Sequence, residues 1–169
     1  PGHVVFSAEM ERTLQVLDYA ILVVSGADGV QGHTRTLWNL LARYQVPTFI
    51  FINKMDQDGT DRQDRLTELK RKLSGECVDF TEAGEEFLEE LSMCDETVME
   101  SYLENGEITA SQIQTLIRER KVFPCYFGSA LKLEGVQELL DGLEKYRAKI
   151  GGHDASSVPM SVSRPLSSG

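Results

Sequence analysis

The sequence TFIFINKMD, which spans residues 48–56, decides the fold of this chain. Its first part, Thr48–Ile52, is a short run of apolar and β-branched residues without polar alternation. Such a run predicts a strand that is covered on both faces, as the strands of a parallel sheet are. Polar residues follow directly at the carboxyl end of the strand, where open α/β sheets bind their ligands. The stretch therefore predicts a parallel sheet with a binding loop at its edge.

Segments with strand and helix patterns alternate on both sides of this stretch. Residues 19–24 form a second apolar run and residues 122–127 form a third, in which Pro124 predicts an edge strand or a strand start. Helical spacing of apolar residues is found in five segments, which are residues 7–17, 34–44, 62–73, 110–120 and 136–146. This order predicts the α/β class with a doubly wound parallel sheet. Because three strands make a thin sheet, we expect an incomplete one, with further strands upstream of Pro1.

Negative charge is concentrated in one segment. The chain of 169 residues holds 17 Lys and Arg against 27 Asp and Glu, a net charge of −10, and this excess argues against a surface that wraps nucleic acid. Between Ser74 and Ile117 there is no Lys or Arg. The same segment contains twelve acidic residues, which are Glu76, Asp79, Glu82, Glu85, Glu86, Glu89, Glu90, Asp95, Glu96, Glu100, Glu104 and Glu107. The spacing of its apolar residues predicts an acidic helical insert, for which a solvated helical face is one interpretation.

Composition limits the class of protein. Hydrophobic residues make up 41% and charged residues 26%, as in a soluble globular domain. No apolar run reaches the roughly 18 residues that a membrane span needs. Cys77, Cys94 and Cys125 are widely spaced without a C-x-x-C pair, so we expect neither disulfides nor a zinc site, and a cytoplasmic location. The composition of residues 148–169, rich in Gly, Ser and Pro, predicts a disordered tail after a domain at residues 1–147.

The polar residues that follow Ile52 have the chemistry to bind a purine. The Asp56 carboxylate could accept two hydrogen bonds from a ring N–H and an exocyclic amine, which guanine presents side by side and adenine does not. The Lys54 stem could lie on the face of the base, and the Asn53 amide could tie neighbouring loops together. A polar turn after a strand is the alternative interpretation of the same residues.

Two further segments would complete such a site. Residues 128–132, GSALK, follow the strand at residues 122–127 and would reach the same crevice, where a backbone N–H could donate to a purine carbonyl. At the start of the chain, Gly2 could contact a terminal phosphate and His3 could orient a water for in-line attack. A small-residue turn and a solvated histidine are the respective alternatives.

Together these segments resemble the G domain of translational GTPases. Residues 1–38 resemble the segment that begins at the family's Asp-x-Pro-Gly-His switch motif, NKMD at residues 53–56 resembles its guanine-specificity motif, and GSAL at residues 128–131 resembles its third base-binding loop. The likeness covers about residues 1–146 and is greatest to elongation factor G and the ribosomal-protection tetracycline-resistance proteins. The insert between NKMD and GSAL is shorter than in elongation factor G, which favours the resistance type.

The resemblance implies roles in reading the base. Asp56 would bind guanine N1 and N2, Lys54 would pack on the base, and Asn53 would brace the loop. Ser129 would support Asp56, while the Ala130 N–H would bind the guanine carbonyl. The implied guanine-binding residues are Asn53, Lys54, Asp56, Ser129, Ala130 and Leu131.

The resemblance also implies roles near the phosphates. Gly2 would contact the γ-phosphate, and His3 would be the catalytic residue that positions the water. Gln31, Thr34 and Arg35 match a Gln-x-x-Thr-Arg run of the family, which we interpret as structural. A G-x-x-x-x-G-K-[ST] sequence and switch I are absent from the chain, and so are the residues that would hold the Mg²⁺ that accompanies GTP or GDP in complete members.

These features imply a partial G domain of the P-loop type, which corresponds to its C-terminal half. The parent protein would be a GTPase that acts on the ribosome, and the acidic segment at residues 76–107 would contact a basic stalk protein. We expect this chain alone to be inactive, with no membrane partner and no sequence-specific nucleic acid. The alternative is a truncated, non-catalytic interaction fragment, which would self-associate through an exposed edge at residues 20–24.

Overall fold

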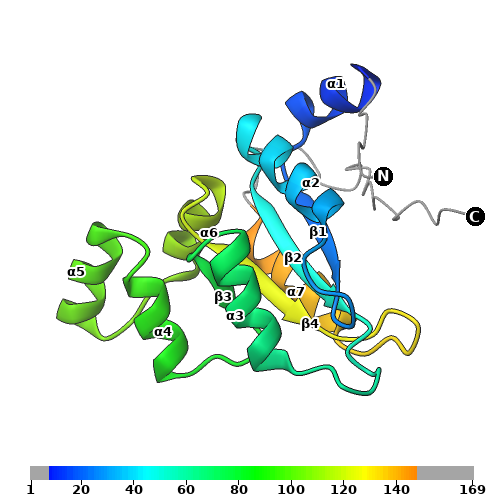
Figure 1. Ribbon diagram of the computed structural model, residues 1–169. Coiled ribbons are helices and arrows are strands. Elements are labelled where there is room, and N and C mark those ends of the chain that lie inside the picture. The colour runs from blue at the N-terminus through cyan, green and yellow to red at the C-terminus, as the bar shows by residue number, and fades with distance from the viewer. Residues whose placement is uncertain (1–7, 148–169) are drawn as a thin grey trace, which may run out of the picture.

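Four short strands run parallel and lie side by side in the order β1-β2-β4-β3 (Figure 1). The strands are β1 (Ala20–Ser25), β2 (Thr48–Asn53), β3 (Cys77–Asp79) and β4 (Phe123–Phe127). The chain is represented by a computed structural model, which describes residues 8–147. The predicted α/β class with a parallel sheet is confirmed. The proposed division at residue 147 stays a prediction, since the expected tail lies outside the described residues.

The prediction of three strands was wrong by one. The sequence at Cys77–Asp79 was assigned to the helical acidic insert, but it forms β3 and pairs with β4, with Cys77 opposite Phe123. A strand of three residues is too short to show a hydrophobic period of its own. The pairing with an already buried neighbour therefore decides its conformation.

Pro124 does not mark an edge, because β4 lies between β2 and β3. The N–H of Phe123 donates to the carbonyl of Glu76 beside β3, so the nitrogen of the next residue faces β2. Pairing with β2 begins only at Cys125, opposite Ile50. The proline therefore occupies a strand start where no donor is needed, which was the other alternative for this residue.

Seven helices accompany the sheet in the described part of the chain. They are α1 (Ala8–Val16), α2 (Gly32–Arg43), α3 (Arg62–Lys72), α4 (Glu85–Ser92), α5 (Glu96–Asn105), α6 (Ala110–Arg118) and α7 (Val136–Tyr146). The five predicted helices are confirmed, and their ends agree to within two residues. The helical part of the acidic segment is divided between α4 and α5, because Asp95 caps the second of them by accepting the Val98 N–H at 3.2 Å. No described helix is long and apolar enough to cross a membrane.

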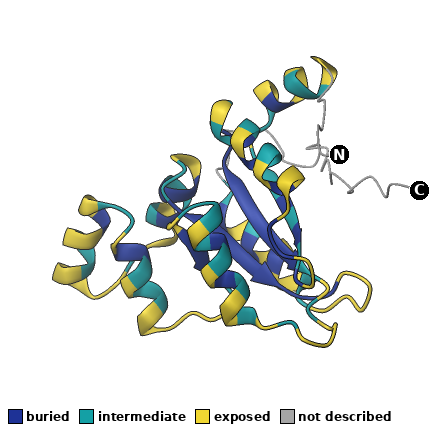
Figure 2. Cartoon of the chain, viewed as in Figure 1, coloured by how far each residue is buried: buried dark blue, intermediate teal, exposed yellow. Residues whose placement is uncertain are grey.

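The sheet separates two apolar cores (Figure 2). Alternate residues of β2 face opposite sides, so Ile50 and Ile52 pack with side chains of α2 and α3, whereas Phe49 and Phe51 pack with side chains of α4 to α7. All four of these side chains are buried. The continuous apolar run in the sequence thus corresponds to a strand covered on both faces, as predicted.

The acidic segment is attached to the rest of the domain by three ion pairs. Its three half-buried acids each pair with a base from outside the segment, namely Asp79 with Arg62 (2.6 Å), Glu90 with Lys70 (3.0 Å) and Asp95 with Lys121 (2.8 Å). The other nine acids are exposed. Figure 1 shows α4 and α5 projecting from the β3 side of the sheet, at the opposite end from β1.

Candidate functional site

The carboxyl ends of the parallel strands bring the predicted base-binding segments together. β2 leads into the NKMD segment at residues 53–56, and its neighbour β4 leads into GSALK at residues 128–132. These segments lie far apart in the chain. They meet because parallel neighbours end at the same edge of a sheet.

Backbone and side-chain hydrogen bonds join the two loops. The Gly128 N–H donates to the Ile52 carbonyl, and the Met55 N–H donates to the Gly128 carbonyl, both at 3.0 Å. The Ala130 N–H donates to Asn53 Oδ1 at 2.8 Å. Asn53 thus ties the two loops together, and its role in nucleotide binding stays a prediction.

Asp56 is poised as a charged acceptor at this edge. Its side chain is 21% exposed, and its Oδ2 lies 3.6 Å from the Lys132 Nζ. A hydrogen bond from the Ser129 hydroxyl is the main reason that the pKa of Asp56 is lowered; partial desolvation opposes it and Lys132 assists it. Ser129 itself is 1% exposed, so its hydroxyl is held in place. The contact between Ser129 and Asp56 is the one that the resemblance implies, and the role of both residues in nucleotide binding stays a prediction.

The three other predicted residues Lys54, Ala130 and Leu131 differ from Asp56 in exposure, backbone conformation or hydrogen bonding. Lys54 and Leu131 are exposed, and Lys54 adopts a left-handed conformation with φ of 60°. An unbranched side chain tolerates this conformation at a cost of about 1 kcal/mol, which is typical of functional loops. The Ala130 N–H, the predicted donor to guanine, is engaged by Asn53. A base could therefore use this donor only by sharing it with Asn53 or by displacing Asn53.

The predicted phosphate-binding residue Gly2 and the predicted catalytic residue His3 lie outside the described residues. Within residues 8–147, no group of three or more His, Cys, Asp or Glu side chains could hold a metal ion. Of the predicted site, the described residues include only the two loops that follow β2 and β4.

The run at the start of α2 has a structural role in its first two members. The Gln31 N–H donates to Thr34 Oγ1 at 3.3 Å, and the Gln31 side-chain amide donates to the Asp28 carbonyl at 2.7 Å. Thr34 is buried, whereas Arg35 is exposed. These contacts organise the start of the helix, in agreement with the structural interpretation.

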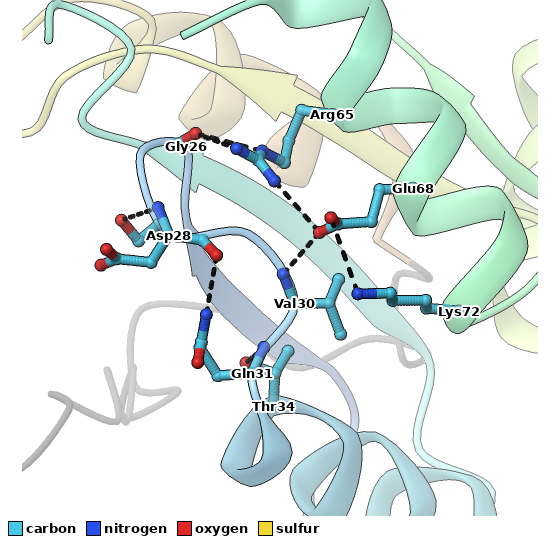
Figure 3. A network of polar contacts seen from close by, with 9 residues as sticks. Gly26, Asp28, Val30, Gln31, Thr34, Arg65, Glu68 and Lys72 are labelled. Atoms are coloured by element: carbon cyan, nitrogen blue, oxygen red, sulfur yellow. Dashed lines mark hydrogen bonds and ion pairs between the residues drawn. The ribbon is translucent and has the colours of Figure 1, made fainter. Parts of the chain in front are cut away.

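Sequence reasoning missed the residues of α3 that support the edge (Figure 3). Arg65 donates two hydrogen bonds to the Gly26 carbonyl, and Glu68 accepts the Val30 N–H. Burial alone would raise the pKa of Glu68, but the Val30 N–H and the Arg65 guanidinium outweigh it, and the pKa is lowered. The available signal was an Arg–Glu pair at i and i+3 on the buried side of α3, beside Leu66 and Leu69.

The geometry agrees with comparisons to known proteins. The sequence profile of the elongation factor Tu GTP binding domain matches residues 1–149. The chain belongs to this GTP-binding domain family. Elongation factor G 2 from Geobacter metallireducens (strain ATCC 53774 / DSM 7210 / GS-15) is 30% identical over 86% of the chain, and tetracycline resistance protein TetP from Clostridium perfringens is 33% identical over 86%.

The chain spans 28% of the length of elongation factor G 2 and 26% of that of TetP. A crystal structure from Thermus thermophilus has the same fold, with a TM-score of 0.70 over 83% of this chain and 28% of the other. Its sequence identity to the GTP-binding domain described here is 22%. The family and the α/β fold are thereby established.

Proposed function

We propose that this chain reads the guanine base of GTP or GDP with the loops that follow β2 and β4. The observation that carries the proposal is the ionised Asp56 carboxylate, which the buried Ser129 hydroxyl supports beside the junction of Asn53 and Ala130. A fixed carboxylate that is charged at neutral pH accepts hydrogen bonds well. Membership in the GTP-binding family supports guanine as the base.

Asp56 and the Ala130 N–H would bind the polar edge of the base, and Lys54 and Leu131 would pack on its face. Asp56 would accept hydrogen bonds from guanine N1–H and the N2 amine, whereas adenine has no such pair of donors there. The stem of Lys54 and the exposed Leu131 would flank the base, and the Ala130 N–H would donate to the guanine carbonyl after release from Asn53. Guanine would therefore replace two existing contacts, the Lys132–Asp56 ion pair and the Ala130–Asn53 hydrogen bond.

The same proposal predicts weak binding and no turnover by this chain alone. The chain contains no G-x-x-x-x-G-K-[ST] sequence, whose backbone and lysine hold the phosphates in P-loop proteins. Phosphoryl transfer depends on that positioning and on electrostatic stabilisation of the phosphoryl group. In a complete protein, Gly2 would contact the γ-phosphate and His3 would position the attacking water.

We assign the whole protein to the ribosome-dependent translational GTPases, acting in the cytoplasm as an elongation factor G or a tetracycline-resistance protein. The two named relatives support this assignment, and the short insert between NKMD and GSAL favours the resistance type. The exposed acids of the segment at residues 76–107 would face a basic ribosomal stalk protein.

Substitution of Asp56 by Asn tests the base-reading role. In solution, we expect the chain to bind GDP more tightly than ADP or XDP, and Asp56→Asn to lower GDP affinity about tenfold or more, as loss of a charged hydrogen bond does. Because the new amide offers a donor, XDP should become the preferred ligand. Titrations followed by the amide NMR signals of residues 54 and 129–131 measure all three affinities.

The matched control is Asp58→Asn, an exposed carboxylate in the same loop, which should leave base preference unchanged. An unchanged GDP preference in Asp56→Asn would contradict the assignment. Absence of any nucleotide binding, together with self-association, would favour the alternative of a non-catalytic interaction fragment. One observation favours that alternative: among the described residues β1 pairs only with β2, beside an apolar groove of about 180 Å³ between α1, β1 and α2.

A further inference from the structure

Side chains of α3 hydrogen-bond to the backbone of the loop between β1 and α2 (Figure 3). Arg65 Nε and Nη2 donate to the Gly26 carbonyl at 3.0 and 2.7 Å, and Arg65 Nη1 lies 3.1 Å from Glu68 Oε1. The same Glu68 oxygen accepts the Val30 N–H at 2.6 Å. Both charged side chains are less than 20% exposed. Arg65 therefore depends on Glu68 and the loop for its partners, whereas Glu68 is also paired with Lys72 at 3.7 Å.

The loop in turn contacts the backbone of the base-reading residues. The Gly26 N–H donates to the Asn53 carbonyl at 2.6 Å. A Cβ added at Gly26 would lie 2.6 Å from Met55 Sδ and 2.8 Å from the same carbonyl, so only a glycine permits this approach. Asn53 then accepts the Ala130 N–H through its side chain. A continuous series of hydrogen bonds leads from Arg65 through Gly26 and Asn53 to Ala130.

The backbone of Gly29 also lies close to the Arg65 and Glu68 side chains of α3. Its backbone is left-handed, with φ of 74°, and a Cβ added there would collide with Arg65 Nη1 and Glu68 Oε1. A side chain at residue 29 would force the ends of the Arg65 and Glu68 side chains to move. The position of the Arg65–Glu68 pair is thus defined from two directions.

We propose that Arg65 and Glu68 are positioning residues for guanine recognition, which act by holding the loop at residues 26–30 against Asn53. The proposal rests on the proposed function, since Asn53 and Ala130 matter for the base only if this edge reads guanine. Loss of the Arg65 guanidinium leaves the Gly26 carbonyl without its two donors and leaves Glu68 with only the Val30 N–H and Lys72 as partners. Asn53 then loses its support, and base-reading groups misplaced by about 1 Å lose much of their effect.

Hydrogen exchange in the unliganded chain tests this coupling without nucleotide. In Arg65→Gln, we expect the Gly26, Val30 and Ala130 amides to exchange about tenfold faster or more, while the Cys125 amide in β4 stays protected. Arg71→Gln is the matched control, because Arg71 lies on the same helix, is exposed and has no contact partner in the described structure. Unchanged Ala130 exchange together with faster Gly26 exchange would overturn the proposal.

If the Arg65→Gln variant does not fold, a pair of glycine substitutions tests the same coupling. Gly29→Ala and Gly59→Ala both place alanine at a positive φ, of 74° and 79°, but a Cβ at Gly59 meets nothing within 4 Å. Backbone strain is therefore matched, and only Gly29→Ala displaces the ion pair. Faster Ala130 exchange in Gly29→Ala alone supports the proposal, and equal Ala130 exchange in both variants overturns it.

Arg65→Lys adds a test of rescue. Lysine keeps the charge beside Glu68 but lacks the paired N–H groups that reach Gly26. We expect Val30 protection to be restored and Ala130 protection to be restored only in part. If nucleotide also binds, the preference for GDP over XDP should fall in Arg65→Gln. A chain that shows the exchange effects but binds no nucleotide would refute the proposed function and leave the coupling intact.

Discussion

Gly128 keeps the loops that follow β2 and β4 close together. Its N–H and its carbonyl both bond to the β2 segment, at Ile52 and Met55. A Cβ added at this position would collide with the Glu134 carbonyl and lie 2.9 Å from Gly135 Cα. Both of these obstacles are backbone atoms, which cannot rotate away as a side chain can. The junction between the loops therefore requires glycine for reasons of space alone.

We expect Gly128→Ala to lower the free energy of unfolding by about 1–3 kcal/mol, as overpacking of a tight site does. Urea unfolding followed by circular dichroism measures the change. Gly75→Ala is the control, since a Cβ at Gly75 meets nothing within 4 Å and that variant should keep its stability. Equal stability of the two variants would show that the loops can separate at little cost.

At this scale, sequence reasoning found the residues with distinctive chemistry and missed their supports. Asp56 was predicted because its type and its position after a strand are informative, and Ser129 because GSAL resembles a family motif. Lys132 was given no role, although its ammonium lies 3.6 Å from Asp56. Arg65 and Glu68 look like ordinary surface charges of an amphipathic helix, because nothing local indicates that the loop at residues 26–30 lies against them.

Helix α6 shows how a local signal can determine an element boundary. Thr109 Oγ1 accepts the Gln112 N–H at 3.2 Å, and Gln112 Oε1 accepts the Thr109 N–H at 2.9 Å. These two reciprocal hydrogen bonds form a capping box. It fixes the start of the helix whose Ile113, Leu116 and Ile117 cover one face of the sheet.

We expect Thr109→Ala to destabilise the domain by about 1 kcal/mol, since both donors at the helix start lose their partner or its alignment. Thermal unfolding monitored by circular dichroism gives the difference. Ser111→Ala provides the comparison, because Ser111 lies in the first turn of the same helix and is exposed. A similar loss in both variants would point to helix propensity instead of capping.

The element that sequence reasoning missed lacks a signal of this kind. β3 has three residues within an acidic, helix-rich segment, and its strand conformation depends on pairing with β4. The position of α4 and α5 depends likewise on distant partners, namely the apolar core that holds Leu91 and Val98 and the bases that pair with Glu90 and Asp95. Partners far away in the chain decide both features.

Across the whole molecule, three carboxylates link stability to pH. The pKa values of Asp56, Glu68 and Asp95 are all lowered from ordinary values of 3.8 for Asp and 4.5 for Glu, with a hydrogen bond from Lys121 as the main cause at Asp95. Groups with a lowered pKa bind protons more weakly in the folded chain than in the unfolded chain. Their contribution to stability is complete above the ordinary values and is lost as the pH falls through the lowered ones.

We therefore expect the free energy of unfolding to change little between about pH 7 and about pH 5.5 from these groups, and to fall below about pH 4. Urea midpoints measured at several pH values test this expectation. Glu68→Gln should be less stable at neutral pH and show a shallower decline in acid, because its side chain no longer titrates. Parallel curves for the two proteins would exclude Glu68 from the acid transition.

The sequence by itself determined the layered α/β class, three of the four strands and the helices on their faces, and it led to the residues that are proposed to read a base. Those features depend on apolar periodicity, capping and turn chemistry, all of which act over a few neighbouring residues. Only the tertiary structure decided that β4 lies inside the sheet, that β3 exists, and that α3 supports the loop beside Asn53. These features depend on contacts between residues far apart in the chain. Such contacts stabilise the fold only after both faces of the sheet are buried.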